Sequence, residues 1–157
     1  QRHRTPLHRA ASRGYVEVCK LLLALRANSS LRDTHGAAPI HLVASKGRLP
    51  IVDLLLSHDR SCASAVDYSG RTPCHMAALK GHLLVVQKLI AARANVEAEA
   101  LDGRRPVDMA RRGQYVEIIH YLESSRRRRA YEEEDLPAAR AVLGALFRHG
   151  LRTTEGS

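Results

Sequence analysis

Four side chains able to bind a metal or transfer a proton recur at nearly equal intervals along the 157-residue chain. They are His8, His41, His75 and Asp108, separated by 33, 34 and 33 residues. Ligands of one metal ion lie about 2 Å from it, whereas side chains on successive packed helices are separated by about 10 Å. We therefore predict no metal site and no cofactor, and instead structural histidines that hydrogen-bond backbone groups near a turn, with Asp108 accepting similar donors.

The three cysteines carry little further chemistry. Cys19, Cys62 and Cys74 show no C-x-x-C spacing, and any pairing leaves one thiol over, so neither a disulfide framework nor a zinc site is indicated. Cysteines without a disulfide framework are typical of proteins in a reducing compartment. We expect Cys19 and Cys74 to be buried at apolar helix positions, while Cys62, near a predicted loop, is the thiol whose exposure needs testing.

Enzyme motifs are missing from the sequence. It contains no phosphate-binding G-x-x-x-x-G-K-[ST], no G-x-G-x-x-G opening a helix, no H-E-x-x-H and no G-x-S-x-G. The carboxylates are scattered over predicted helix surfaces and turns and do not form pairs in a pocket. We therefore predict that the protein is not an enzyme.

The elements that position the histidines recur with them. Thr5-Pro6-Leu7-His8 is followed at the same period by Ala38-Pro39-Ile40-His41, Thr72-Pro73-Cys74-His75 and Arg105-Pro106-Val107-Asp108. Each of the first three copies continues into a run of small residues ending at Gly14, Gly47 or Gly81, and then into an apolar run. Self-similarity at a period near 33 residues predicts a repeat protein.

Each copy carries the signals of two short helices. Thr5 and Thr72 can cap a first helix, and the following proline suits its first turn, where an N–H has no partner. The glycine fits the left-handed position that ends this helix. The apolar run predicts a second helix, with Pro50 in its first turn in the second copy. No single unit can bury its apolar face, so we expect the units to stack.

This unit resembles the ankyrin repeat, D-x-x-G-x-T-P-L-H-x-A-A-x-x-G-x-x-x-V-V-x-L-L-L, over about residues 5–125. The resemblance implies an all-α solenoid of stacked helix–turn–helix units with short β-hairpin turns and a C-terminal helical cap. We predict an ankyrin repeat domain at 1–125, with repeats starting near residues 5, 38, 72 and 105. The family usually has glycine after the second helix, where this chain has Arg26, Asp59, Arg93 and Arg126; a left-handed backbone there would cost about 1 kcal/mol per site.

We expect residues 126–157 to close the C-terminal end of the repeat stack. Arg126–Arg129 precede the acidic run Glu132–Asp135, which favours a self-neutralising surface stretch; a localisation signal or anion-binding patch is the alternative. Beyond them lie four apolar residues on one helical face, Val142, Leu143, Leu146 and Phe147. We expect this segment to form a capping helix or a degenerate fifth repeat on the polar fourth repeat.

The resemblance also implies where a partner binds, because ankyrin partners usually touch the hairpin tips and the concave face of the first helices. On the first helices the positions expected to be exposed are Arg9, Leu42, Met76 and Met109, then Ser12, Ser45, Leu79 and Arg112, then Arg13, Lys46 and Lys80. On the hairpins they include His35, Tyr68, Arg71, Leu101 and Arg104. Apolar side chains flanked by bases suit another protein's segment with apolar anchors and acidic flanks.

Composition leaves two alternatives open. Lys and Arg number 25 against 16 Asp and Glu, a net charge of +9, and residues 1–50 carry +7 of it (9 positive, 2 negative). Such a surface can attract nucleic acid or anionic lipid, although aromatics are only 4% and offer little base stacking. An ankyrin-type kinase inhibitor is a third hypothesis. With no apolar run long enough to span a membrane and no signal peptide, we expect an intracellular monomer, cytoplasmic or nuclear, excised from a longer chain that opens before Gln1.

Overall fold

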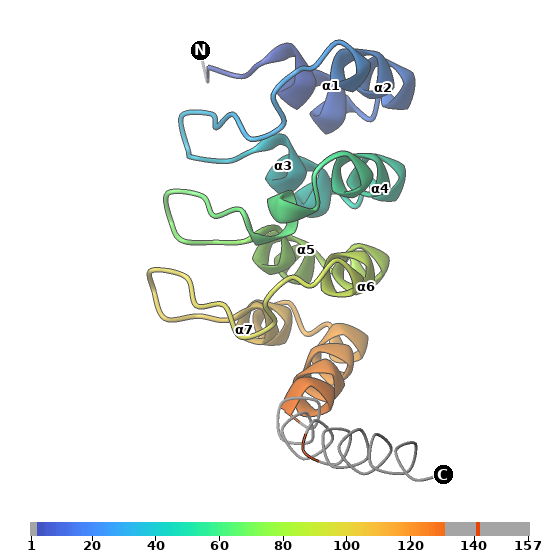
Figure 1. Cartoon of the computed structure of the whole chain (residues 1–157). Helices are drawn as coiled ribbons and strands as arrows, with labels where there is room; N and C mark the ends of the chain where they lie inside the picture. Colours follow the sequence, from blue (N-terminus) through green and yellow to red (C-terminus); the bar gives the residue numbers. More distant parts are fainter. Residues whose placement is uncertain (1–2, 131–140, 142–157) are drawn as a thin grey trace, which may run out of the picture. The chain divides into compact units, whose positions relative to one another are not determined.

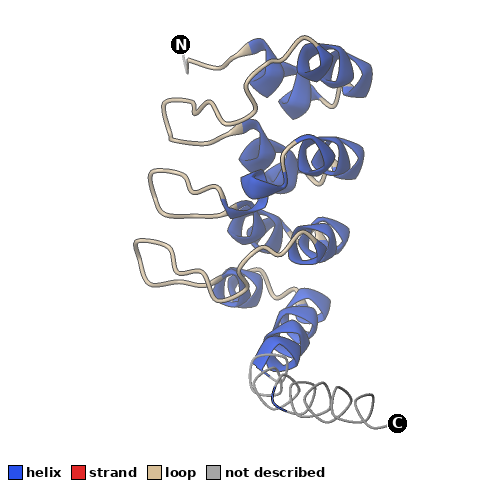
Figure 2. Cartoon of the chain, in the orientation of Figure 1, coloured by secondary structure: helices blue, strands red, loops and turns tan. Residues whose placement is uncertain are grey.

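The computed structural model describes residues 3–130 and 141, and these residues contain helices and loops without any strand (Figure 2). The first helices of the repeats are α1 (Pro6–Arg13), α3 (Pro39–Lys46), α5 (Pro73–Lys80) and α7 (Pro106–Arg112). The second helices are α2 (Val16–Ala24), α4 (Leu49–His58) and α6 (Leu83–Ala91), and a short 3-10 helix, η1 (Arg60–Ser64), follows α4. The fourth repeat continues into a helical run over residues 116–130.

The first helices begin and end as their sequences predict. Each starts at its proline after a residue with extended backbone, and at α1 the side chain of Thr5 accepts the N–H of His8. Gly14, Gly47 and Gly81 end α1, α3 and α5 in the left-handed region, with φ of 88°, 66° and 78°. A residue with a side chain pays for this conformation and glycine does not. The helix starts at proline, the ends at glycine and the Thr5 cap are thus confirmed, whereas the side chain of Thr72 makes no cap hydrogen bond.

The helix pairs stack in chain order within residues 1–122 (Figure 1). α1, α3, α5 and α7 pack successively, as do α2, α4 and α6, and a loop projects from each junction between repeats. The core consists of small and medium apolar side chains, such as Ala11, Val43, Ala44, Ala77 and Val86. Short side chains let the helices approach closely, which explains how a domain with 4% aromatic residues fills its interior. The predicted all-α repeat solenoid is confirmed, but the expected β-hairpins are loops.

The glycine-replacing residues after the second helices divide into two kinds. Arg26 and Arg93 are left-handed, with φ of 61° and 68°. Asp59 is extended, with φ of −147°, because its carboxylate caps η1 by accepting the N–H of Ser61. Arg126 lies inside the helical run 116–130. The cost of a left-handed backbone therefore does not arise at Asp59 and Arg126, where a new helix begins or the old one continues.

The chain from Glu123 onward forms a second unit. Within it, the structure describes residues 123–130 and 141. Arg126–Arg129 are helical. The capping helix expected around Val142–Phe147 and the acidic run Glu132–Asp135 lie outside the described residues. The boundary at residue 125 stays a prediction.

Candidate interaction surface

Three histidines join each repeat to the loop of the next. The Nε2 atoms of His8, His41 and His75 lie 2.9, 3.1 and 2.9 Å from the carbonyl oxygens of Ala37, Arg71 and Arg104. Their Nδ1 atoms lie 3.3, 3.2 and 3.1 Å from the backbone nitrogens of Thr5, Ala38 and Thr72. The predicted role of these histidines in hydrogen-bonding backbone groups is confirmed, and it extends across the repeat boundary.

The two contacts fix the protonation state of each ring. Nδ1 accepts a backbone N–H and so carries no proton, which leaves Nε2 to donate to the carbonyl, and the imidazole is neutral. Burial lowers the pKa of His8, His41 and His75 below its ordinary value. In the fourth repeat Asp108 takes over the capping half of this role, since its carboxylate accepts the N–H of Arg105 at 2.9 Å.

The projecting loops end in similar turns, which we call the loop tips (residues 33–37, 67–71 and 100–104). In each tip the first residue donates its N–H to the carbonyl of the last, at 2.9, 3.0 and 2.9 Å. In the first two, Asp33 and Asp67 also accept two N–H groups of their own turn. Burial alone raises the pKa of Asp33, but these two N–H groups and the Arg4 guanidinium together lower it below its usual value.

Backbone hydrogen bonds connect one loop tip to the next. The N–H of Tyr68 donates to the carbonyl of His35 at 3.1 Å, and the N–H of Leu101 donates to that of Ser69 at 2.9 Å. The second residue of each later tip is thereby bonded to the third residue of the tip before it. The three tips form one continuous edge along the stack (Figure 1).

Two apolar side chains lie uncovered on this edge. Tyr68 is 64% exposed and Leu101 is 81% exposed. Together with Ser69, Arg71 and Asp102 they line a hollow of about 350 Å³ between the second and third tips. Asp102 lies 3.9 Å from Arg71 and 3.7 Å from Arg104, and the Nε atom of Arg71 is buried without a hydrogen-bond partner.

The first-helix positions predicted to be exposed divide into three groups. Five are exposed: Arg9, Arg13, Lys46, Lys80 and Arg112. Four are half-buried: Leu42, Ser45, Met76 and Leu79. Two are buried, so their expected exposure is wrong: Ser12 and Met109. Met109 belongs to the apolar core, which suits an uncharged thioether. Of the tip residues, His35 and Arg104 are exposed and Arg71 is half-buried.

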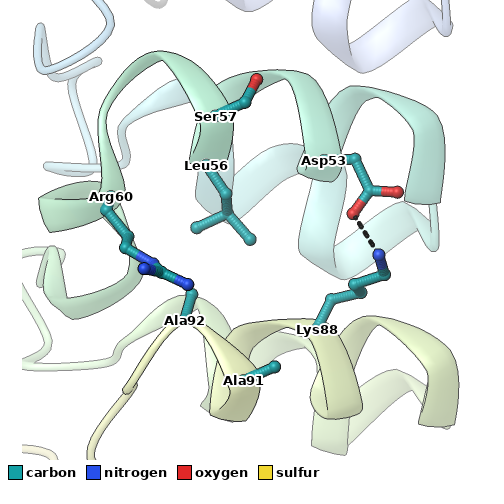
Figure 3. Close-up of a pocket in the computed structure, with 7 residues that line it drawn as sticks. All are labelled: Asp53, Leu56, Ser57, Arg60, Lys88, Ala91 and Ala92. Carbon is teal, nitrogen blue, oxygen red and sulfur yellow. Dashed lines mark ion pairs between the residues drawn. The ribbon is translucent and has the colours of Figure 1, made fainter.

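A second hollow, which the sequence analysis did not predict, lies between α4 and α6 (Figure 3). Its volume is about 430 Å³, and its apolar lining comes from Leu56 on α4 and from Ala91 and Ala92 at the end of α6. The ion pair between Asp53 and Lys88 closes one side, with 3.1 Å between carboxylate oxygen and ammonium nitrogen. Lys88 stands where the two preceding repeats have leucine, and that substitution was the available sequence signal.

The cysteines and the possible metal ligands do not form a reactive site in the described part of the chain. All three cysteines are buried, and burial raises the pKa of the Cys62 thiol to about 12, with Asp59 adding to the shift. Cys62, the thiol whose exposure needed testing, lies in η1 and is buried. Within residues 3–130, no three His, Cys, Asp or Glu side chains are grouped as a metal site. No helix of the described chain is long and apolar enough to cross a membrane.

Comparison with known proteins identifies the repeats. A family model described as ankyrin repeats in three copies matches residues 7–100. A putative ankyrin repeat protein of Rickettsia bellii is 33% identical over 119 residues, covering 74% of this chain and 50% of the relative. Rabankyrin-5 of Mus musculus is 43% identical over 54 residues, and the nuclear factor NF-kappa-B p105 subunit of Gallus gallus is 40% identical over 65. These cover 34% and 41% of this chain but only 5% and 6% of the relatives, so the chain spans half or less of the proteins it matches.

Proposed function

The chain belongs to the ankyrin repeat family, and we propose that it is a non-catalytic module that binds a segment of another protein along its loop-tip edge and the adjoining first helices. Ankyrin repeats in general are protein–protein interaction modules, and stacked repeats offer extended binding surfaces. A fold does not by itself fix a function, so the proposal rests on particular side chains.

The observation that carries the proposal is the exposure of Tyr68 and Leu101 on adjacent loop tips. Tyrosine is enriched among the side chains that carry most of the binding energy of interfaces, and the neighbouring leucine adds apolar area that a partner can bury. The backbone hydrogen bond from Leu101 to Ser69 holds both side chains on rigid tips, so binding them costs little ordering. The hollow between them offers a place for one apolar side chain of the partner.

The charges around this hollow indicate the partner's chemistry. Arg71 and Arg104 share a single carboxylate, Asp102, at distances of 3.9 and 3.7 Å, and both side chains are partly exposed, so N–H groups of the two guanidinium groups have hydrogen-bonding capacity left. A carboxylate beside the partner's apolar anchor would complete these donors. The partner is therefore a segment with apolar anchors and acidic flanks.

The experiment isolates partners by cross-linking and mass spectrometry and then measures the affinity of each recovered partner by calorimetry. We expect Tyr68→Ser with Leu101→Ser to weaken binding by more than about 1 kcal/mol. Leu84→Ser is the matched control, because Leu84 is an exposed apolar residue on α6, away from the loop tips. Equal affinity of the double variant and the control would refute the proposed site.

The first-helix face is tested by Leu42→Ser with Met76→Ser. Both side chains are half-buried, so this variant also loses some stability, and its affinity is compared at a temperature well below its unfolding midpoint. Charge reversal at Arg13 and Lys46 should mainly slow association and flatten its salt dependence.

One observation favours a second candidate, the binding of a polyanion. Arg13, Lys46, Lys80 and Arg112 are exposed in the last turns of α1, α3, α5 and α7. Stacking places these last turns in succession, which makes a basic row. Binding to generic duplex DNA or acidic vesicles that falls steeply with salt, and weakens when these four residues are replaced, would favour this candidate.

A further inference from the structure

The end of the stack formed by α1 and α2 leaves uncovered an apolar position that the later repeats bury. Val18, Ile51, Val85 and Ile118 occupy the same place in successive repeats, 33, 34 and 33 residues apart. The last three are 1%, 1% and 2% exposed, whereas Val18 is 45% exposed. The residue types are alike, so the difference lies in what surrounds them.

The prolines that begin the first helices also show that the α1–α2 end of the stack is uncovered. Pro39, Pro73 and Pro106 are buried at the start of α3, α5 and α7, while Pro6 at the start of α1 is exposed. α3 packs on α1 and α4 packs on α2, and the next pair packs on these in turn. Ile51 and Val85 thus lie in repeats that are stacked on a preceding helix pair, and Val18 does not. A preceding pair is what covers this position.

The uncovered position belongs to a longer apolar strip on α2 and its end. Leu21 and Leu25 are exposed and lie three and seven residues after Val18, on the same side of the helix. Terminal repeats of solenoids normally present a polar outer face to water. A strip of three large apolar side chains is instead the surface of a helix that packs against another helix.

We propose that this end face, comprising Pro6, Val18, Leu21 and Leu25, is a stacking site for one further helix pair of the same repeat type, with a neutral or acidic rim. The interface would continue the one already formed by α2 with α4 and by α4 with α6. The inference concerns a different surface from the loop-tip edge and does not depend on the proposed function.

Charge argues against a second copy of this chain as the occupant. Residues 1–37, which include the first repeat, carry 7 positive and 2 negative side chains, and Arg9 and Arg26 are exposed there. Two such ends brought face to face would repel each other. A repeat close to neutrality avoids this, and residues 38–71 of the chain itself have that property, with four positive and three negative side chains.

The test adds such a repeat to the full chain. In the extended chain, residues 38–71 are repeated directly before Thr5, so that Arg71 takes the place of Arg4 before the same Thr-Pro pair. The hydrogen bond from His41 to the Arg71 carbonyl is contained within the added unit. We expect a single unfolding transition with a higher midpoint than that of the original chain, because the added pair buries the end face.

The substitution Val18→Asp, made in both chains, reports whether the added pair covers this face. Position 18 is in the first turn of α2, where a carboxylate is tolerated, so in the original chain we expect less than about a threefold change in the unfolding equilibrium constant. In the extended chain we expect more than about a tenfold change, because the same carboxylate would be buried. Leu84→Asp, at an exposed position of α6, should act alike in both chains.

Three outcomes would overturn the proposal. One is an equal effect of Val18→Asp in the two chains. Another is an added repeat that melts separately and leaves the midpoint of the original chain unchanged. The third is a dimer of the original 157-residue chain in sedimentation equilibrium that Val18→Asp abolishes, since a second copy would then be the occupant.

Discussion

The Nε2 atom of His75 donates a hydrogen bond over 2.9 Å to the carbonyl oxygen of Arg104, which lies 29 residues later at the end of the next loop tip. The Nδ1 atom of the same ring accepts the N–H of Thr72 at 3.1 Å. One imidazole thus satisfies the start of α5 and the loop that leads into α7, and both bonds require the neutral ring.

The substitution His75→Asp separates these two functions. The carboxylate can still accept the N–H of Thr72, as Asp108 accepts that of Arg105 in the fourth repeat, but it cannot donate to the Arg104 carbonyl. We expect the free energy of unfolding, measured by denaturant titration, to fall by about 1–3 kcal/mol. His35→Asp, at an exposed loop tip, is the control. Equal losses in the two variants would show that the inter-repeat bond contributes nothing.

Stability should also fall in mild acid. Burial lowers the pKa of His8, His41 and His75 from the ordinary 6.5, so below pH 6.5 the unfolded chain binds protons that the folded chain does not. The free energy of unfolding therefore decreases as the pH falls through about 6.5 towards the folded-state pKa values, and its full value is present above 6.5.

The measurement for this prediction is the unfolding midpoint in urea at intervals between pH 7.5 and 5.5. Asp33 and Asp108 have a pKa lowered from 3.8, so their contribution is lost only at lower pH and does not interfere. A midpoint that stays constant or rises on acidification over this range would contradict the neutral-histidine arrangement.

Arg93→Gly should leave stability unchanged or raise it by up to about 1 kcal/mol. Arg93 has a φ of 68°, which glycine adopts without the steric cost of a side chain. Asp59→Gly is the contrasting variant, because Asp59 is extended and its carboxylate caps η1, so we expect a loss of about 1 kcal/mol there. A clear loss in thermal melts of Arg93→Gly would mean that the arginine side chain itself contributes packing.

Gly81→Ala should be much more damaging than Gly103→Ala. Both glycines are left-handed, with φ of 78° and 74°, so both variants carry a similar backbone cost of about 1 kcal/mol. A Cβ at Gly81 would lie 2.5 Å from the ring of Tyr115, while a Cβ at Gly103 meets nothing within 4 Å. In denaturant titrations, the free energy of unfolding that Gly81→Ala loses beyond the loss in Gly103→Ala measures the steric cost of the contact with Tyr115. If the two variants lose equal stability, the Tyr115 ring moves aside at no cost.

The sequence predicted the parts of this fold that local chemistry determines. The period, the helix starts at proline, the helix ends at glycine and the structural role of the histidines follow from residue types at fixed spacing. What it did not predict depends on neighbouring repeats. Nothing in the residue types separates Met109, which is buried, from Leu42 and Met76 at the same register, which are half-buried. Likewise, the extended backbone of Asp59 follows from an inserted 3-10 helix that the repeat pattern does not encode.

The bonds of His8, His41 and His75 run in one direction, from a repeat to the loop that follows it, and this gives those three contacts a polarity. His82 of the third repeat is the counterexample, because its Nε2 atom lies 3.1 Å from the carbonyl oxygen of Ser45 in the second repeat. Removal of the first repeat would leave only the carbonyl of Ala37 without its donor, and water can replace that donor. Removal of the fourth repeat and the loop before it would leave the Nε2–H of His75 without its acceptor and open the ring to protonation. An unfolding motor that pulls from the C-terminal end would thus remove the acceptor of His75, then of His41, then of His8, whereas one that pulls from the N-terminal end would instead remove the acceptor of His82, when the second repeat unfolds.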